Sequence, residues 1–464
     1  MRFKANKGIH VPSHKKDTYL LATETYLTPE YVYIPLSLRG NDFDVLVKAG
    51  DQVKLGQVIA RRDEKKGLPL VKHATVSGEV VGIERKNHRT GMPFQSIVIK
   101  NDFKDTPVEG LKSIDPDKVD RDTLINFLLD SGVVGQGGAG FPTAVKYRTE
   151  ARIDTVILNG AECEPYLTGD YRMMIEETKK IFDGLEILMK AAQAEKGIIA
   201  IKKSYKEVYK ALNSEAKNHP NISVILLPNI YPAGWERTVV YRATKRTYDR
   251  LPSECGVIVN NVQTALSVST AVRTGKPVIE RVLTVAGEGV INPKNVKVRI
   301  GTLASDVINF CKGLATDMGE LRVIAGGPMT GTAHKNTEFV VTRALSGIVV
   351  LPGIEEYHVP HNQPVGDVLL NVLHLDGHTS SHFVLDEQPC VRCMSCVKAC
   401  PAGLQPTLLS VAALNKNEKE LGALDVDACI SCGSCTYVCP SHISLSANIS
   451  KGKTFYASKQ RNKK

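Results

Sequence analysis

Cysteines are the residues of this sequence with the clearest chemistry: eleven are present, and eight fall in two short runs. Each run has the spacing C-x2-C-x2-C-x3-C-P, and the two end at Pro401 and Pro440. Three cysteines at this spacing can wrap one cubane, while the fourth, before the proline, ligates the other cluster in two-cluster ferredoxins. The sequence therefore predicts two 4Fe–4S clusters with crossed ligands, the first on Cys390, Cys393, Cys396 and Cys439, the second on Cys429, Cys432, Cys435 and Cys400.

Structural zinc is the alternative use of such cysteines. Zinc sites mostly use paired C-x2-C knuckles with four ligands in all, which two triplets and two outlying Cys-Pro pairs fit poorly. Between the runs, apolar residues recur at near-helical spacing, so we expect a largely helical cluster domain. Clustered cysteines at metal-ligand spacing are typical of a reducing compartment, which favours a cytoplasmic protein.

A glycine-rich segment, GQGGAGFPTAVKY (135–147), could bring backbone amides close to a phosphate or a flavin edge. A helix beginning near Pro142 would add the positive end of its dipole, and Lys146 lies about one turn further on. The segment differs from the dinucleotide fingerprint and from the Walker loop, because no strand directly precedes it and no Gly-Lys-Ser/Thr follows. Taken alone, a plain tight turn explains it equally well.

Three more segments carry polar side chains in loops: NGAECEPY (159–166), YPAGWERT (231–238) and VIVNNVQTA (257–265). Polar ligand contacts collect after strands in open α/β sheets, although a surface loop or helix cap is the ordinary explanation for any single one. Alternating strand and helix patterns around them predict a parallel sheet. The predicted elements are a helix at 124–135, a strand at 154–162, a helix at 171–193 and strands at 196–202 and 222–228.

Upstream, residues 30–105 show two hairpin-like blocks with glycine turns, typical of a barrel-sandwich (lipoyl-like) module. The exposed lysine turn that carries a lipoyl or biotinyl group is not evident. We therefore interpret the module as a docking domain rather than a carrier with a swinging arm.

Together these segments resemble the flavoprotein subunit of respiratory complex I, which holds FMN and NADH. They are still more similar to the RnfC subunit of the Rnf electron-transport complex (RnfC/RsxC family), which the motifs GIHVPSHK (8–15), LNGAECEPYLT (158–168), GKPVIERVLTVAGEG (275–289) and GGPMTG (326–331) also resemble. The resemblance covers essentially the whole chain. It implies a multidomain α/β plus β fold: a barrel-sandwich hybrid, a complex I-type FMN-binding α/β domain, a soluble-ligand-binding β-grasp (SLBB) module and a helical two-cluster ferredoxin domain.

The predicted domains follow that order: 1–110 barrel-sandwich, 111–255 FMN and NADH binding, 256–360 SLBB, 361–450 ferredoxin-type, and 451–464 a basic tail. This tail could contact membrane partners or anionic lipid, and it is most simply a frayed, solvated end. The resemblance places Glu164 and Phe141 on the nicotinamide side. Flavin contacts fall on Gly135, Gly137, Gly138, Lys146, Asn159, Glu162, Glu236, Asn260, Asn261 and Thr264.

Two residues depart from the family pattern. Ala161 stands where complex I has an Asp, so one ribityl hydrogen bond must come from elsewhere. Trp235 stands where Rnf-like sequences usually have a small residue, and its indole could stack on a ring or block the nicotinamide pocket.

The implied function is that of an NADH- and FMN-linked electron-transfer subunit of a membrane-bound, ion-translocating ferredoxin:NAD oxidoreductase, passing electrons between NAD(H), FMN and the two clusters. No side chain needs to act as acid or base, because hydride transfer requires stacking. The implied partners are the integral membrane and flavoprotein subunits and a ferredoxin-type iron–sulfur subunit, with a peripheral position on the cytoplasmic face of the cell membrane. Two alternatives remain: a soluble flavin and iron–sulfur reductase (a cobalamin reductase, or an electron feeder to an amino-acid reductase), and a flavin-free iron–sulfur relay.

Composition agrees with a folded, multidomain protein: 464 residues, 42% hydrophobic and 23% charged. The net charge of +10 is mild for this length and does not by itself imply DNA, and a single Trp argues against a stacking platform for nucleic acid. The start of the chain lacks the apolar stretch of a secretory signal, and no apolar run is long enough to span a membrane.

Overall fold

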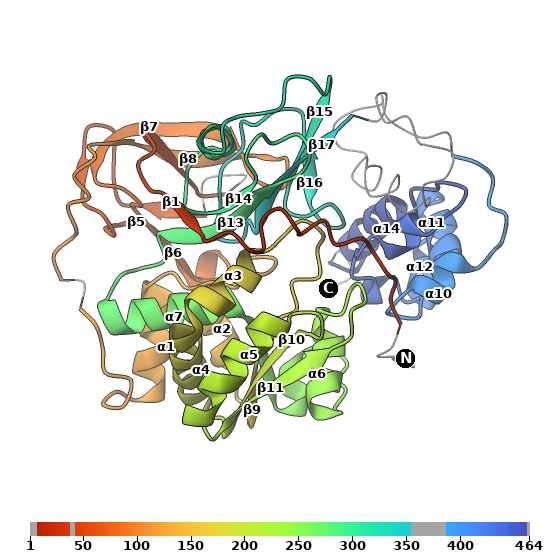
Figure 1. The fold of residues 1–464 in the computed structure, drawn as a ribbon, viewed down its shortest axis with the longest axis horizontal. Helices are drawn as coiled ribbons and strands as arrows, with labels where there is room; N and C mark the ends of the chain where they lie inside the picture. Colours follow the sequence, from red (N-terminus) through yellow and green to blue (C-terminus); the bar gives the residue numbers. More distant parts are fainter. Residues whose placement is uncertain (1–6, 38–41, 111, 354–386, 462–464) are drawn as a thin grey trace.

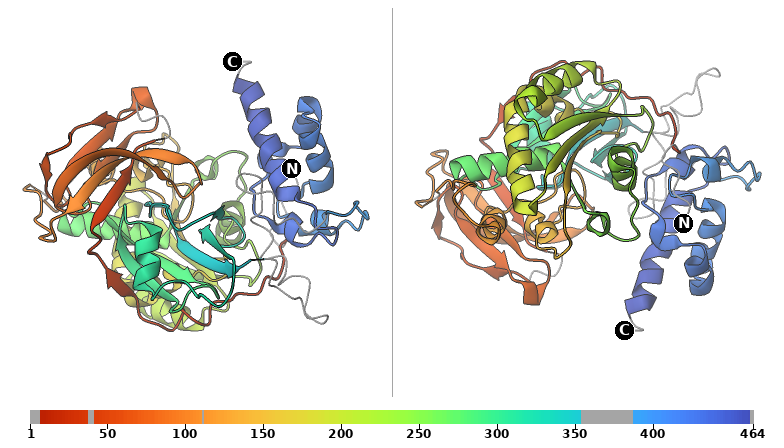
Figure 2. Two further views of the ribbon diagram at one scale, coloured as in Figure 1. Left: turned by 90° about the horizontal axis from the view of Figure 1, so that it is seen from above. Right: turned by 90° about the horizontal axis from the view of Figure 1, so that it is seen from below.

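A computed structural model describes residues 7–37, 42–110, 112–353 and 387–461. Figure 1 shows a β-sandwich and a larger sheet beside each other above an α/β unit, with a helical C-terminal unit at one end. Figure 2 shows the same arrangement from two further sides, with the helical unit lying outside the main body. In the part of the chain that the structure describes, no helix is both long and apolar enough to cross a membrane.

The α/β unit is built on a four-stranded parallel sheet in the order β11-β10-β9-β12. Both faces of this sheet are buried: in β9, Val156 and Leu158 join the core formed with α1, α4 and α7, while Ile157 joins the core formed with α6. Burial on both faces explains why the strands are near-continuous apolar runs. The strands are β9 (Thr155–Gly160), β10 (Lys196–Lys202), β11 (Ile222–Leu227) and β12 (Val257–Asn261).

The helices of this unit differ from the predicted ones at two places. The first, predicted to reach residue 135, ends at Asp130, because Gly132 turns the chain away with φ 70°. The helix predicted at 171–193 is two helices that break at Glu177, where the Thr178 hydroxyl donates to the Met174 carbonyl at 2.7 Å. The helices are α1 (Arg121–Asp130), α2 (Thr143–Tyr147), α3 (Gly169–Glu176), α4 (Thr178–Ala192), α5 (Lys206–Glu215), α6 (Glu236–Thr244) and α7 (Val262–Thr274).

The β-sandwich pairs a four-stranded sheet, β2-β8-β7-β4, with a three-stranded sheet, β3-β5-β6. Their inner faces enclose a core that includes Val32, Ile59, Ile97 and Ile99, all fully buried. The strands are β2 (Tyr31–Pro35), β3 (Asp44–Val45), β4 (Gln52–Val53), β5 (Val58–Arg62), β6 (Leu70–His73), β7 (Gly78–Asn87) and β8 (Pro93–Asn101).

The largest sheet has six strands in the order β1-β14-β13-β17-β15-β16, with α8 packed on it. Its edge strand β1 comes from the N-terminal segment and pairs in parallel with β14. The N-terminal segment thus ties the start of the chain to a sheet formed more than 250 residues later. The elements are β1 (Glu24–Tyr26), β13 (Glu280–Ala286), β14 (Lys294–Arg299), α8 (Ala304–Phe310), β15 (Leu321–Ala325), β16 (Thr332–His334) and β17 (Gly347–Pro352).

The C-terminal unit is helical, as the segment between the cysteine runs predicts. Its long helix α14 packs on α11 and α12 around Leu409, Leu421 and Ile449. The helices are α10 (Ser395–Ala399), α11 (Pro406–Leu414), α12 (Glu418–Ala423), α13 (Ser434–Tyr437) and α14 (Leu445–Arg461).

Two features differ from the expected domain limits. The parallel sheet continues through β12 and α7, beyond the limit expected after residue 255, because β12 pairs with β9. The described part of the basic tail is not frayed: α14 is helical as far as Arg461, and Lys453 donates to the carbonyls of Asp427 and Cys429 at 2.9 and 2.7 Å. The first part of the expected ferredoxin domain, 361–386, lies outside the described residues.

Candidate functional site

The glycine-rich loop lies against the start of α7, at the edge of the parallel sheet where β12 ends. The Gln136 amide donates to the Thr264 hydroxyl at 3.1 Å, and the Asn261 side chain caps α7 by accepting from the Gln263 amide at 2.9 Å. Gly137 approaches Asn261 so closely that a Cβ would lie 2.8 Å from its Nδ2, whereas a Cβ on Gly138 would meet nothing within 4 Å. The loop is therefore fixed to α7 on one side and open on the other.

Buried polar atoms without partners lie behind this loop. Asn260 donates from Nδ2 to the Tyr147 hydroxyl at 2.6 Å, but within the described residues its buried Oδ1 has no hydrogen-bond partner, and neither does the buried hydroxyl of Thr143. Lys146 Nζ donates to the Val259 carbonyl at 2.9 Å; burial lowers its pKa, and Glu236 acts in the opposite direction. Unsatisfied buried polar atoms beside an open glycine loop fit a polar ligand such as the flavin.

The loop after β9 packs against the loop 231–238. Asn159 donates from Nδ2 to the Gly234 carbonyl at 2.8 Å and accepts from the Ala161 amide at 3.1 Å. Ala161 is fully buried, and a Cβ on Gly234 would lie 3.2 Å from its methyl group. The small residue Ala161 therefore allows the two loops to approach.

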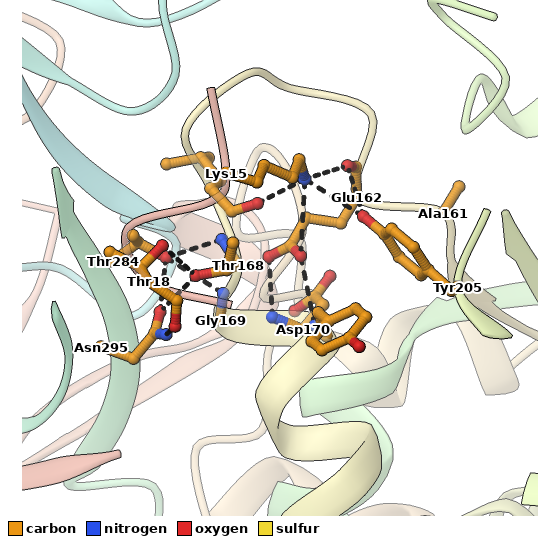
Figure 3. Close-up of polar contacts among 12 residues, drawn as sticks. Lys15, Thr18, Ala161, Glu162, Thr168, Gly169, Asp170, Tyr205, Thr284 and Asn295 are labelled. Atoms are coloured by element: carbon orange, nitrogen blue, oxygen red, sulfur yellow. Dashed lines mark hydrogen bonds and ion pairs between the residues drawn. The ribbon is translucent and has the colours of Figure 1, made fainter. Parts of the chain in front are cut away.

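Glu162 has both carboxylate oxygens engaged at the start of α3 (Figure 3). Oε1 accepts from the Asp170 amide at 2.7 Å and Oε2 from the Tyr171 amide at 3.2 Å, with Lys15 Nζ 3.7 Å from Oε2. Burial raises the pKa of this carboxyl, and Lys15 opposes the rise. Its role as a flavin contact stays a prediction; in this structure the side chain organises the loop.

Lys15, which the sequence reasoning did not assign, is buried beneath the same loop (Figure 3). Its ammonium group donates to the Glu162 carbonyl at 2.8 Å, to the Tyr205 hydroxyl at 3.1 Å and to the Leu167 carbonyl. Burial lowers its pKa, against the pull of the Glu162 carboxylate. The available signal was the motif GIHVPSHK, which resembled the family but suggested no role for its lysine.

A second buried network attaches α3 to the six-stranded sheet (Figure 3). The Thr284 hydroxyl accepts from the amides of Thr168 and Gly169 at 2.9 and 3.0 Å and donates to Asn295 Oδ1 at 2.8 Å. The hydroxyls of Thr18 and Thr168 lie 2.7 Å apart. This network connects the loop after β9, called the flavin-loop region below, to the six-stranded sheet and to the N-terminal segment.

Asp170 is a further site residue that the sequence reasoning missed. Its carboxylate accepts from Asn261 Nδ2 at 2.6 Å and from Gln263 Nε2 at 2.9 Å. It therefore links the start of α3 to the start of α7.

The remaining predicted residues lie apart from this network. The Glu164 carboxylate accepts from the Met329 amide at 2.9 Å and from the Thr330 hydroxyl, so it contacts the GGPMTG loop. Burial raises its pKa. Glu236 accepts from the Tyr248 hydroxyl at 2.9 Å, and Phe141 is 37% exposed.

The cysteines of the predicted second cluster surround one small cavity. Cys400, Cys429, Cys432 and Cys435 line a space of about 20 Å³, and backbone amides of Leu404 and Ser431 each approach a sulfur at 3.4 Å. Burial and the neighbouring Cys432, Cys429 and Cys400 raise the pKa of the Cys435 thiol. Four converging thiols with amide donors fit a 4Fe–4S cluster.

The cysteines of the predicted first cluster lie further out. Cys396 and Cys439 pack with Leu445, while Cys390 and Cys393 are exposed. Among the described residues, no three His, Cys, Asp or Glu side chains are grouped to hold a single metal ion.

Aromatic side chains connect the loops of the α/β unit to the second cysteine run. The Tyr231 hydroxyl donates to the Cys432 carbonyl at 2.7 Å, and Tyr231 packs with Met329 and Tyr437 in a cluster that Cys163 and Cys432 both contact. Trp235 packs on the neighbouring core that contains Cys400, so its indole contacts the helical C-terminal unit. The second cysteine run therefore lies beside the flavin-loop region.

Family models match four parts of the chain and confirm the predicted fold class. They are the RnfC barrel sandwich hybrid domain over residues 3–104, the Nuo51 FMN-binding domain over 128–270, the SLBB domain over 282–333 and the 4Fe-4S dicluster domain over 389–443. FMN and two 4Fe–4S clusters are the cofactors that these domains hold.

Curated relatives match most of the chain. The RnfC subunit of the proton-translocating ferredoxin:NAD(+) oxidoreductase complex of Clostridium ljungdahlii is 35% identical over 87% of this chain and 83% of its own length. The RnfC subunit of the Na(+)-translocating ferredoxin:NAD(+) oxidoreductase complex of Acetobacterium woodii is 34% identical over 86% of this chain and 85% of its own. A solved NAD+-reducing [NiFe]-hydrogenase matches 77% of this chain and 64% of its own at 17% identity, with a TM-score of 0.47. On the identity and coverage of its curated relatives, the chain belongs to the RnfC family.

Proposed function

We propose that this protein is the NADH- and FMN-linked electron-transfer subunit of an ion-translocating ferredoxin:NAD+ oxidoreductase complex. The observation that carries the proposal is the match, over most of the chain, to the RnfC subunits of two such complexes, one proton-translocating and one Na(+)-translocating. The FMN-binding domain and the dicluster domain in one chain supply the cofactors that this function requires.

When bound, the flavin exchanges a hydride with NAD(H) and passes electrons singly to the iron–sulfur clusters, which is why a flavin is needed between the two. The residues proposed to hold it begin with the amides of the glycine loop. The others are Lys146, Asn159, Glu162, Glu236, Asn260, Asn261 and Thr264, with Phe141 and Glu164 proposed on the nicotinamide side.

The packing of the cysteine runs supports an order for the clusters. Cys432 contacts the group formed by Tyr231 and Met329, next to the flavin-loop region, whereas Cys390 and Cys393 are exposed. We infer that the second run holds the cluster nearer the flavin and that the first run faces an electron partner.

The partners and the location follow from the same proposal. The integral membrane subunits, the flavoprotein subunits and the ferredoxin-type iron–sulfur subunit of the complex are the proposed partners. The chain would then act as a peripheral subunit on the cytoplasmic face of the membrane.

Anaerobic reduction of the purified protein by NADH tests the proposal. We expect bleaching of the flavin absorbance, one FMN released by acid per chain, and about eight irons per chain. A preparation with that iron content but without flavin would replace the proposal with a flavin-free relay. Flavin that NADH leaves oxidised would contradict the NADH-linked function.

A further inference from the structure

A cavity lies where the β-sandwich, the glycine-rich loop and the segment before β17 meet. Its volume is about 120 Å³, more than one water needs. Ala139 and Gly140 of the glycine-rich loop form one wall, and Thr342, Arg343 and Ala344 form another. A Cβ on Gly140 would lie 3.3 Å from that of Ala344, so the two walls are in close contact.

The lining of this cavity is cationic. Lys72, Arg89 and Arg343 all line it, and its lining includes no Asp or Glu. Asp42 is the one carboxylate that raises the pKa of Lys72, and it is ion-paired with Arg62 at 2.9 Å. Three basic side chains therefore share this space without a carboxylate among the described lining residues.

The described contacts of these cations are all to neutral groups. Arg343 donates from Nη1 to the Val71 carbonyl at 2.8 Å, and Arg89 donates from Nη2 to the Gly138 carbonyl at 3.1 Å. Lys72 Nζ lies 5.5 Å from the centre of the Phe43 ring. Such contacts orient the side chains and leave their charges uncompensated.

A buried hydroxyl completes the donor set. Thr342 is 8% exposed, and its Oγ1 has no hydrogen-bond partner within the described residues. Leaving a buried hydroxyl unpaired costs free energy, so an unpaired one in a cavity indicates a missing partner.

The pKa values of the lining side chains also favour a bound anion. Burial, then Arg343 and Arg62, lower the pKa of Lys72 to about 7, and burial lowers that of Arg343 to about 10. A bound anion would oppose both effects, because it favours the charged form of each side chain.

We propose that this cavity is a binding site for a phosphoryl group, held by Lys72, Arg343 and the Thr342 hydroxyl. A phosphate dianion matches the excess of positive charge and supplies acceptor oxygens for all three donors. The group arrives either as inorganic phosphate or on a nucleotide bound along the glycine-rich loop. Because Arg89 lines the cavity and also holds the Gly138 carbonyl, an occupied site would steady that loop.

Titration of the anaerobic holoprotein with inorganic phosphate, in a phosphate-free buffer, tests the site by calorimetry and thermal shift. Phosphate should raise the unfolding temperature of the wild-type protein, because it binds only the folded state. Lys72→Gln should weaken phosphate binding by roughly tenfold or more, since it removes a charge-assisted hydrogen bond. Lys100→Gln, a matched change at an exposed lysine on β8, should leave binding unchanged.

Thr342→Val separates a ligand role from a structural one. This variant keeps the shape of the side chain and removes the unpaired hydroxyl, so without phosphate its unfolding temperature should equal or exceed that of the wild type. Its phosphate affinity should nevertheless fall. A loss of affinity without a loss of stability is not expected of a residue that only packs.

Nicotinamide nucleotide distinguishes the two sources of the phosphoryl group. If phosphate competes with NADH, and Lys72→Gln raises the NADH concentration needed to bleach the flavin, the group belongs to the nucleotide. If phosphate binds but NADH bleaching is identical in wild type and Lys72→Gln, the site takes free phosphate. Wild-type protein that shows neither a heat nor a thermal shift with millimolar phosphate, together with unchanged NADH bleaching in Lys72→Gln, overturns the proposal. The phosphate titration does not depend on flavin reduction, so it can fail while the proposed function stands.

Discussion

Replacing Lys15 by Met removes the ammonium group that lies beneath the loop after β9. The substitution keeps the length and apolar character of the side chain, so the main change is the loss of charge and of donors. The Glu162 and Leu167 carbonyls and the Tyr205 hydroxyl lose their contacts with this lysine, and the Glu162 carboxylate loses its cation at 3.7 Å. We expect the loop to lose order and the folded state to lose stability.

The magnitude follows from burial. Both partners are almost fully buried, with side chains 10% and 8% exposed. Breaking a buried pair by removing one partner costs about 3–5 kcal/mol, because the other charge remains without compensation. For a unit the size of the α/β domain, that loss lowers the unfolding temperature by roughly 6–20 °C.

The loss must also depend on pH, and Glu162 sets the sign. Its pKa is raised from 4.5 to about 7, so its contribution to stability is full below pH 4.5 and is lost as the pH rises through 7. Without Lys15, the largest effect that opposes burial is lost, so this pKa rises further. The deficit of Lys15→Met should therefore be smallest at pH 5 and should grow as the pH rises to 7, which lies below the pKa of about 8 at which Lys15 itself titrates.

Thermal unfolding between pH 5 and 7, with hydrogen exchange at the amides of Asp170 and Tyr171, measures this effect. Lys16→Met is the control, because Lys16 is the exposed neighbour of Lys15. The double variant Lys15→Met/Glu162→Gln should regain stability and lose the pH dependence. A deficit that is constant across this pH range, or equal in the Lys16→Met control, would refute the assignment of a buried, charge-compensating role.

Three further predictions concern contacts between the units and one cluster ligand. Gly327→Ala places a Cβ 2.4 Å from Glu164 Oε2, so we expect the free energy of unfolding to fall by about 1–3 kcal/mol, measured by thermal unfolding. Unchanged stability would show that the GGPMTG loop moves to accommodate the added methyl group without cost. Cys435→Ser should lower the iron content from about eight to about four per chain and keep the flavin, whereas the buried Cys311→Ser should retain both; a full iron content in Cys435→Ser would contradict the ligand assignment. Trp235→Ala should slow cluster reduction by NADH, followed by paramagnetic resonance, while flavin bleaching persists; equal rates would remove the indole from the contact between flavin domain and clusters.

The grouping of the cysteines could be predicted because its signal is local. Spacing within a dozen residues indicates which thiols share a turn, and the crossing of Cys400 to the second run is expected of the fourth cysteine in a ferredoxin-type run. The structure brings Cys400 together with Cys429, Cys432 and Cys435 around one cavity. The strands at 196–202 and 222–228 were also predictable, because short apolar runs rich in β-branched residues favour strands.

Features that depend on distant parts of the chain were not predictable in this way. The limit expected after residue 255 divides the parallel sheet, since only pairing with β9 shows that β12 belongs to it. Lys15 lies 147 residues from the carbonyl of Glu162 that accepts its hydrogen bond, and no periodicity in the sequence connects them. The wrong limit and the missed lysine both concern which segments contact each other, whereas a sequence pattern indicates the structure of only one segment at a time.

Trp235 shows how the site changes once the partners are known. From the sequence alone, its indole could stack on a ring or block the nicotinamide pocket, since it follows Gly234 in a loop of the flavin domain. In the structure it packs on the core that contains Cys400, while the preceding residue Gly234 accepts from Asn159. One loop therefore contacts the flavin-loop region through its backbone and the cluster unit through its indole. A residue larger than the family pattern is tolerated here because its indole packs on the core of the cluster unit, where burial offsets the cost of ordering the side chain.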